Sequence, residues 1–167
     1  MYRYLMLLLV IPILCFSLQS CHPKPQERVI APTNPSINAE VGRLFLAKNK
    51  LKPGIHSLPN GLQFAILQDG LGVYPSPSDW VTLYYQGQYI DGRVFDNTHA
   101  QNKPIKLQVS QGIPGLQQAL KMMLPGSVWV IYVPPQLAFG EKGIPKLVGP
   151  NQTLVYYVHL ISVEVAD

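Results

Sequence analysis

The segment SQGIPGLQQALKMMLP, residues 110–125, contains the one convincing helical pattern in the second half of the chain. Its apolar residues recur at the spacing of one helix face, namely Ile113, Leu116, Leu120 and Met123. Pro114 suits the first helical position because its missing N–H would have no partner there, and Pro125 prevents the helix from continuing. We therefore expect one helix of about three turns in this segment.

Runs of residues with strand character lie on both sides of this helix. They span Leu62–Leu67, Trp80–Ile90, Arg93–Asp96, Lys103–Val109, Ser127–Val133 and Thr153–Val165. A short helix cannot bury its apolar face alone, so we expect an antiparallel sheet to curl around it in an α+β fold. The helix entrance at Gly112 and Ile113 would then form the floor of a pocket. On composition alone, the simpler interpretation is that Ile113 and Leu116 are core residues.

Composition and charge restrict the function classes. The chain has 167 residues, 47% hydrophobic and 13% charged, which is enough for one domain with a real core and some additional chain. The formal charge of +4 comes without a long basic run, so nucleic acid is not an expected partner. The 4 histidines are scattered, and neither a phosphate loop nor a nucleophile elbow occurs. We therefore expect no metal and no cofactor.

The first 20 residues have the pattern of a secretory signal, with Arg3 ahead of the apolar run at residues 4–16. The run leads to LQSC, residues 18–21, which resembles a bacterial lipoprotein processing site that leaves a lipid on Cys21. The alternative is an ordinary cleaved signal with Cys21 free. Because His22 rather than Asp follows the cysteine, the resemblance favours a lipid anchor in the outer membrane of a Gram-negative bacterium, facing the periplasm.

The rest of the chain divides into three segments. Residues 21–37 are proline-rich and polar, which predicts an unpacked tether. Residues 38–52 carry a short helical pattern, and residues 53–167 contain the strands and the main helix. Within this domain, residues 134–152 form a long loop rich in Gly and Pro, and such loops in compact domains are commonly functional.

Several motifs follow one another in a fixed order in the main domain. They are SDWVTLYYQG (78–87), DGRVFDNT (91–98), IPG (113–115), LPGSVW (124–129), LAFG (137–140) and GPNQTL (149–154). This set resembles the FKBP-type peptidyl-prolyl cis-trans isomerases, and among them the macrophage infectivity potentiator group of bacterial exported proteins. The resemblance runs from about residue 47 to residue 163. Each motif alone is weak, but their joint order is specific.

The resemblance implies a fold, an activity and a set of site residues. The fold is a half-barrel of five to six antiparallel strands wrapped around one short helix, and residues 53–167 form the isomerase domain. The implied catalytic positions are Tyr85, Asp96, Ile113 and Phe139. The implied substrate-binding positions are Phe95, Ile105, Leu116, Ile144, Val148 and Tyr156. In this assignment Ile113 offers its backbone N–H to the substrate carbonyl, and Ile144 and Val148 close over the ligand.

An apolar lining of this kind suits the chemistry of a prolyl amide. Rotation about the amide costs about 18–20 kcal/mol because resonance keeps it planar and polar. A water-free site disfavours that planar form relative to the twisted one, so no nucleophile is needed. Asp96 would orient the Tyr85 hydroxyl and steer the twisted carbonyl. The open alternative for Asp96 is to cap the turn at Asn97 and Thr98.

Three positions depart from the family pattern. Leu116 replaces a tryptophan at the pocket floor, Ile105 stands where phenylalanine is common, and Phe139 lacks a tyrosine hydroxyl. A lost hydrogen bond and a lost flat surface each remove about 1–2 kcal/mol of binding, together about tenfold to several hundredfold. We therefore expect the fold to be kept and turnover to be reduced.

The leading hypothesis is a lipid-anchored prolyl isomerase that assists the folding of exported proteins. Its expected partners are proline-containing exported polypeptides, the membrane through Cys21, and macrolide ligands of immunophilins. The main alternative is a non-catalytic chaperone or surface adhesion module that binds proline-containing segments on the same fold. A third hypothesis is a structural envelope lipoprotein whose pocket is vestigial.

Overall fold

The fold is a single antiparallel sheet with two helices, seen in a computed structural model that describes residues 34–166. The strands are β1 (His56–Ser57), β2 (Gln63–Gln68), β3 (Trp80–Tyr89), β4 (Val94–Asn97), β5 (Ile105–Gln108), β6 (Val128–Val133) and β7 (Leu154–Glu164). The spatial order is β1-β2-β6-β7-β3-β4, and β5 also pairs with β3. The predicted α+β fold with an antiparallel sheet is confirmed, and the strand that the sequence did not predict is the two-residue β1.

Strand β3 pairs with more strands than any other strand of the sheet. It pairs with β7 along its whole length, while β4 and β5 share its other edge. The register places Gly87 opposite both Tyr156 of β7 and Asp96 of β4. Because side chains alternate between the faces of a strand, Tyr85 and Gly87 lie on the same face of β3 as the buried residue Leu83. This face therefore carries both the core and the residues of the candidate site.

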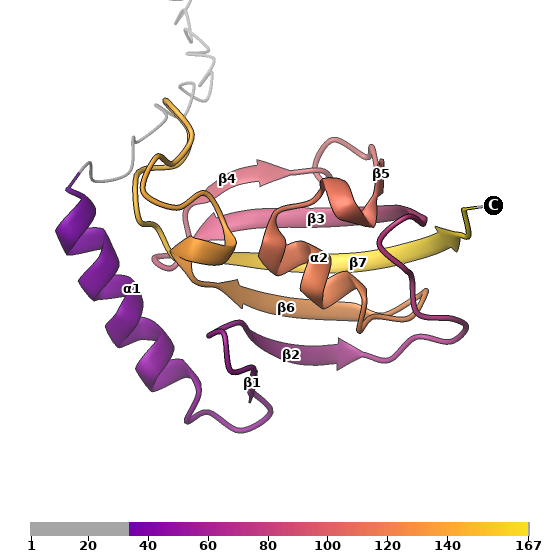
Figure 1. Ribbon diagram of the computed structural model, residues 1–167, viewed down its shortest axis with the longest axis horizontal. Helices are drawn as coiled ribbons and strands as arrows, with labels where there is room; N and C mark the ends of the chain where they lie inside the picture. The colour runs from indigo at the N-terminus through magenta and orange to yellow at the C-terminus, as the bar shows by residue number, and fades with distance from the viewer. Residues whose placement is uncertain (1–33, 167) are drawn as a thin grey trace, which may run out of the picture.

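Helix α2 (Pro114–Leu120) lies across this face of the sheet (Figure 1). It approaches β6 closely, since a Cβ added to Gly115 would lie 2.5 Å from Val133 Cγ1. Leu120 of the helix and Met123 after it have no exposed surface, and neither have the sheet residues Val81, Leu83, Ile131 and Val158. The helix thus covers one face of the sheet (Figure 1), and the core lies between them.

The predicted length of this helix, about three turns, is wrong. The α-helix has 7 residues and follows a short 3-10 helix at Val109–Gln111. Beyond Leu120 the backbone tightens, because Met122 donates to the carbonyl of Ala119 and Met123 to that of Leu120. Met123 is still fully buried, so the apolar spacing of the sequence survives in a different backbone conformation.

The N-terminal helix α1 (Pro35–Asn49) begins earlier than predicted. The amide oxygen of Asn34 accepts hydrogen bonds from the N–H groups of Ser36 and Ile37, and Pro35 occupies the first turn. The prediction of a tether at 21–37 is therefore wrong at its last three residues, and the helix predicted at 38–52 starts at Pro35. The predicted signal peptide, Cys21 and residues 21–33 lie outside the described residues.

Helix α1 packs beside the sheet through ring and amide contacts. Phe45 meets Tyr132 of β6 with ring centroids 6.0 Å apart, and the buried Asn49 donates to the side chain of Gln63 over 3.0 Å. The side-chain amide of Asn38 donates to the backbone carbonyl of Pro150 at 2.8 Å. Between residues 34 and 166, neither helix has the length and apolar character needed to cross a bilayer.

Candidate active site

The hydroxyl of Tyr85 on β3 donates a hydrogen bond to the carboxylate of Asp96 on β4. Burial raises the pKa of the Tyr85 phenol, and the bond to Asp96 raises it further. The phenol is therefore a neutral donor across the physiological range. The turn after β4 uses a different cap, because the amide oxygen of Asn97 accepts from the N–H of Ala100 at 3.1 Å. Of the two roles considered for Asp96, the geometry favours the contact with Tyr85.

Thr98 fixes the backbone of Tyr85 and was not predicted as a site residue. Its hydroxyl accepts from the Tyr85 N–H at 2.9 Å and donates to the Tyr85 carbonyl at 3.2 Å. Thr98 is buried, with only 4% of its surface exposed, so these bonds are shielded from water. The available signal was a small hydroxyl residue two positions after Asp96, which predicts a turn and not a contact across the sheet.

Aromatic rings surround the Tyr85 side chain. The ring centroid of Tyr156 lies 6.1 Å from that of Tyr85 and 5.9 Å from that of Phe95, edge to face with Phe95. Tyr89 continues the group, 5.4 Å from Phe95. Burial also raises the pKa of Tyr156, so its phenol stays neutral. These four rings form one continuous apolar wall on β3, β4 and β7.

Gly87 makes room for this wall. A Cβ at Gly87 would lie 2.6 Å from Phe95 Cζ and 3.0 Å from Tyr156 Cε1. Such distances are shorter than carbon atoms tolerate, so the rings can approach the sheet only because position 87 has no side chain. Sequence reasoning missed this residue, although a glycine inside a strand is a known mark of close approach.

The entrance to α2 forms another side of the candidate site. Ile113 is the residue before the helix, and its carbonyl accepts from the N–H of Gln117 at 2.9 Å. The Gln117 side chain donates back to the carbonyls of Gly112 at 2.7 Å and Ser110 at 3.0 Å. Gln117 therefore holds the turn that presents the Ile113 backbone, a role that its polar character alone did not reveal. Leu116 is 8% exposed and belongs to the core.

The long loop contributes Phe139, Ile144 and Val148, and strand β5 contributes Ile105. Ile144 and Val148 exchange two backbone hydrogen bonds of 2.7 and 2.9 Å, which close a tight turn. Val148 is 3% exposed, so its side chain is part of the core and not a free cover. Phe139 and Ile105 are partly buried and pack against the same core.

The structure gathers the predicted site residues around one core. Leu116, Val148 and Tyr156 belong to it, and the other predicted apolar and aromatic residues pack against it: Tyr85, Phe95, Ile105, Ile113, Phe139 and Ile144. Asp96 is linked to this core by the hydrogen bond that it accepts from Tyr85. Within residues 34–166, no group of three or more His, Cys, Asp or Glu side chains could hold a metal ion. The arrangement offers apolar surface and a few neutral donors.

Comparisons with known proteins agree with this geometry. Residues 72–161 match the family model described as FKBP-type peptidyl-prolyl cis-trans isomerase. Over 127 residues the chain is 49% identical to the peptidyl-prolyl cis-trans isomerase Mip of Coxiella burnetii, and over 129 residues 49% identical to the outer membrane protein MIP of Legionella longbeachae. The crystal structure of FkpA from Escherichia coli superposes with a TM-score of 0.76 at 32% identity.

These matches cover different shares of the proteins. The two Mip matches include 76% and 77% of this chain but only 55% of each Mip protein. The FkpA match includes 80% of this chain and 62% of the FkpA chain. The chain thus spans about half the length of those two relatives. The relatives named Mip confirm the predicted resemblance to the macrophage infectivity potentiator group. From the sequence motifs, the sheet around α2 and these matches, we conclude that the chain belongs to the FKBP-type peptidyl-prolyl cis-trans isomerase family.

Proposed function

We propose that this protein catalyses the cis–trans isomerisation of prolyl bonds in exported polypeptides. The observation that supports the proposal most directly is the neutral Tyr85 hydroxyl, bonded to Asp96 beside the rings of Phe95 and Tyr156. Family membership gives the reaction class, and several relatives are named peptidyl-prolyl cis-trans isomerases. The substrate is an Xaa-Pro bond whose pyrrolidine ring packs on the aromatic wall.

The mechanism requires only differential binding. A planar prolyl amide is more polar than the twisted amide, so an apolar lining lowers the barrier of about 18–20 kcal/mol by favouring the twisted form. The backbone N–H of Ile113 precedes the first turn of α2, where N–H groups lack partners within the helix, and it binds the substrate carbonyl. The Tyr85 hydroxyl, oriented by Asp96, stabilises the charge of the rotating carbonyl.

Weakened catalysis is part of the proposal. Leu116 and Ile105 provide aliphatic surface on the helix and strand β5, and Phe139 has no hydroxyl to donate. These residues reduce transition-state binding more than they reduce the burial of a proline ring, because aliphatic surface still excludes water. The same observation favours a second candidate function, a chaperone that holds proline-containing segments without turnover.

The place of action is also a proposal. One relative is named an outer membrane protein, and the leader and cysteine pattern of residues 1–21 predicts export and a lipid on Cys21. We propose that the lipid anchors the chain to the outer membrane of a Gram-negative bacterium, with the isomerase domain in the periplasm. Macrolide ligands of immunophilins are proposed to compete for the same aromatic wall.

The function is tested with the purified full chain and a short Xaa-Pro peptide. We expect faster cis-to-trans conversion that is inhibited by a macrolide immunophilin ligand and reduced in Tyr85→Phe. Tyr157→Phe is a matched control, because Tyr157 lies on β7 with 42% of its surface exposed. Clear peptide binding without acceleration would leave the chaperone as the better interpretation, and neither binding nor acceleration would reject both.

The lipid anchor needs a separate experiment. Cells that express the chain are labelled with a radioactive fatty acid, and the protein is isolated from the membrane fraction. We expect label on the wild type and none on Cys21→Ala. Absence of label from the wild type, or equal label on both, would contradict the lipid on Cys21.

A further inference from the structure

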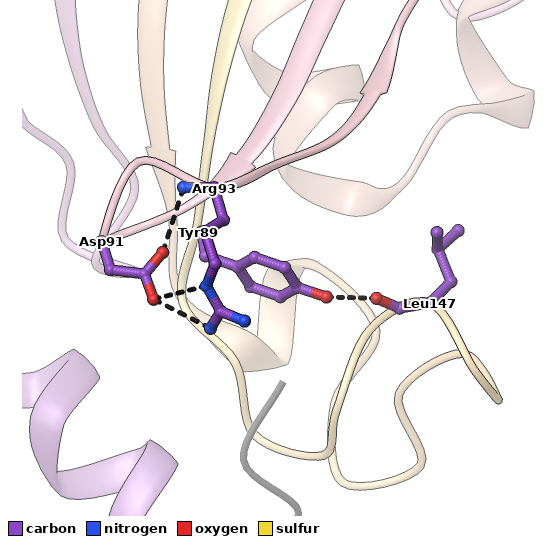
Figure 2. A network of polar contacts seen from close by, with 4 residues as sticks. All are labelled: Tyr89, Asp91, Arg93 and Leu147. Atoms are coloured by element: carbon purple, nitrogen blue, oxygen red, sulfur yellow. Dashed lines mark hydrogen bonds and ion pairs between the residues drawn. The ribbon is translucent and has the colours of Figure 1, made fainter. Parts of the chain in front are cut away.

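Tyr89, the last residue of β3, ties the sheet to the long loop. Its hydroxyl donates a hydrogen bond to the backbone carbonyl of Leu147, as Figure 2 shows. Only 5% of the Tyr89 surface is exposed, and burial raises the pKa of its phenol, so the hydroxyl keeps its proton. A buried bond of this kind is shielded from competition by water.

The loop segment that Tyr89 holds is the turn at residues 144–148. Leu147 lies inside this turn, and its own N–H donates to the carbonyl of Ile144 at 3.0 Å. Lys146 has φ of 63°, a conformation in which non-glycine residues are uncommon. The turn is therefore closed on itself by backbone bonds, and the Tyr89 hydroxyl fixes it to the sheet.

Tyr89 is also one of the four rings of the apolar wall. Its ring centroid lies 5.4 Å from that of Phe95, and the guanidinium of Arg93 lies over the ring at 5.0 Å. Arg93 is in turn paired with the carboxylate of Asp91 at 2.8 Å (Figure 2). One side chain thus contacts both the Phe95 ring of the candidate site and the turn that carries Ile144 and Val148.

We propose that Tyr89 is a positioning residue for peptide binding: its hydroxyl fixes the position of the 144–148 turn relative to the Phe95 ring. This inference rests on the proposed function, because it concerns how the same site holds its peptide. The turn carries two of the predicted substrate-binding residues, of which Val148 is buried and Ile144 is partly exposed. A shift of the turn therefore changes the contact that Ile144 offers to the peptide, without touching Tyr85 or Asp96. A merely structural Tyr89 would affect stability alone.

The test is Tyr89→Phe, which keeps the ring on Phe95 and removes only the hydroxyl. We expect amide hydrogen exchange at Ile144 and Val148 to become about fivefold faster, the size expected for one lost hydrogen bond. The KM for an Xaa-Pro peptide should rise by about the same factor while kcat stays within about twofold. Tyr157 is exposed on β7, so Tyr157→Phe is the matched control and should change neither the amide exchange of the turn nor the KM.

Two outcomes overturn the inference. One is unchanged exchange at the turn in Tyr89→Phe, and the other is a lower melting temperature with an unchanged KM. If the wild type shows no turnover, the proposed function fails, while amide exchange and the Kd for the peptide still decide the role of Tyr89. In that case weaker peptide binding in Tyr89→Phe supports the inference, and equal binding overturns it.

Discussion

On its β side the candidate site is built from rings and polar contacts, whereas its helix-and-loop side is built mainly from aliphatic side chains, with Phe139 as an aromatic exception. The β side holds Tyr85 through Asp96 and Thr98 and packs Phe95 edge to face with Tyr156. The other side presents Leu116, Ile113, Ile144 and Val148, which are placed by backbone turns and by burial in the core. The difference suggests that the β side orients the substrate and the other side chiefly excludes water.

Thus the two sides should respond differently to mutation. Residues of the β side depend on close contacts with specific partners, so small changes should be costly there. Residues of the helix-and-loop side act mainly through apolar volume, so changes of shape should be tolerated if volume is kept. The following predictions compare the two sides, from the largest expected effect to the smallest.

The largest effect is expected for a methyl group added beneath the rings. Gly87→Ala places a Cβ 2.6 Å from the Phe95 ring, so the wall must move. We expect a loss of about 1–3 kcal/mol in the free energy of unfolding and loss of most of the activity. On the helix side, Gly112→Ala meets nothing closer than 3.5 Å and should be nearly neutral in stability. Chemical denaturation of both variants checks this, and equal stability losses would contradict the contrast.

A smaller effect is expected from breaking the polar pair of the β side. Tyr85→Phe and Asp96→Asn should each lower kcat/KM about tenfold, as expected for the loss of one hydrogen bond to a charged group. Because the two residues act as a unit, the double variant should lose about as much as either single variant. Purely additive losses in kcat/KM would show that the two side chains act independently.

On the helix side, a larger side chain at position 116 should raise turnover. Leu116→Trp restores a flat aromatic surface at the entrance of α2, and we expect turnover to rise about fivefold. Leu116 is 8% exposed, so the larger ring has to displace core neighbours and should cost about 1–3 kcal/mol of stability. An unchanged or lower rate in a correctly folded variant would argue against placing Leu116 in the site.

The smallest effect on the site is expected at the other end of β3. Asp79 accepts hydrogen bonds from the N–H groups of Ala166 at 2.9 Å and Ser76 at 2.7 Å, which hold the pKa of its carboxyl below the ordinary value. Its stabilising contribution is therefore complete above the unfolded pKa of about 4 and is lost as pH falls through the lower folded pKa. Asp79→Asn should lower stability at pH 7, flatten the acid-induced loss and leave peptide binding unchanged. Thermal melts from pH 2 to 7, with a peptide-binding measurement at pH 7, check this.

Local patterns in the sequence determined most of the secondary structure. Alternation predicted β3, and runs of aromatic and β-branched residues predicted β6 and β7, each to within a few residues. Pro114 marked the start of α2 correctly. The errors lie at helix ends, where local hydrogen bonds decide the backbone conformation. The Asn34 side chain caps α1, so this helix begins earlier than predicted, and 3-10 hydrogen bonds after Leu120 make α2 shorter than predicted. The motif order was enough to name the family and the residues expected at its site.

The tertiary structure alone decided how those residues are held. Three contacts join strands or loops that sheet register brings together. Gly87 leaves room for the rings, Thr98 bonds to the Tyr85 backbone, and the Tyr89 hydroxyl bonds to Leu147. Tyr89 and Leu147 are 58 positions apart, and no local pattern relates them. The sequence determines which faces are apolar because that depends on neighbours along the chain, whereas a particular contact depends on the three-dimensional packing of the whole sheet.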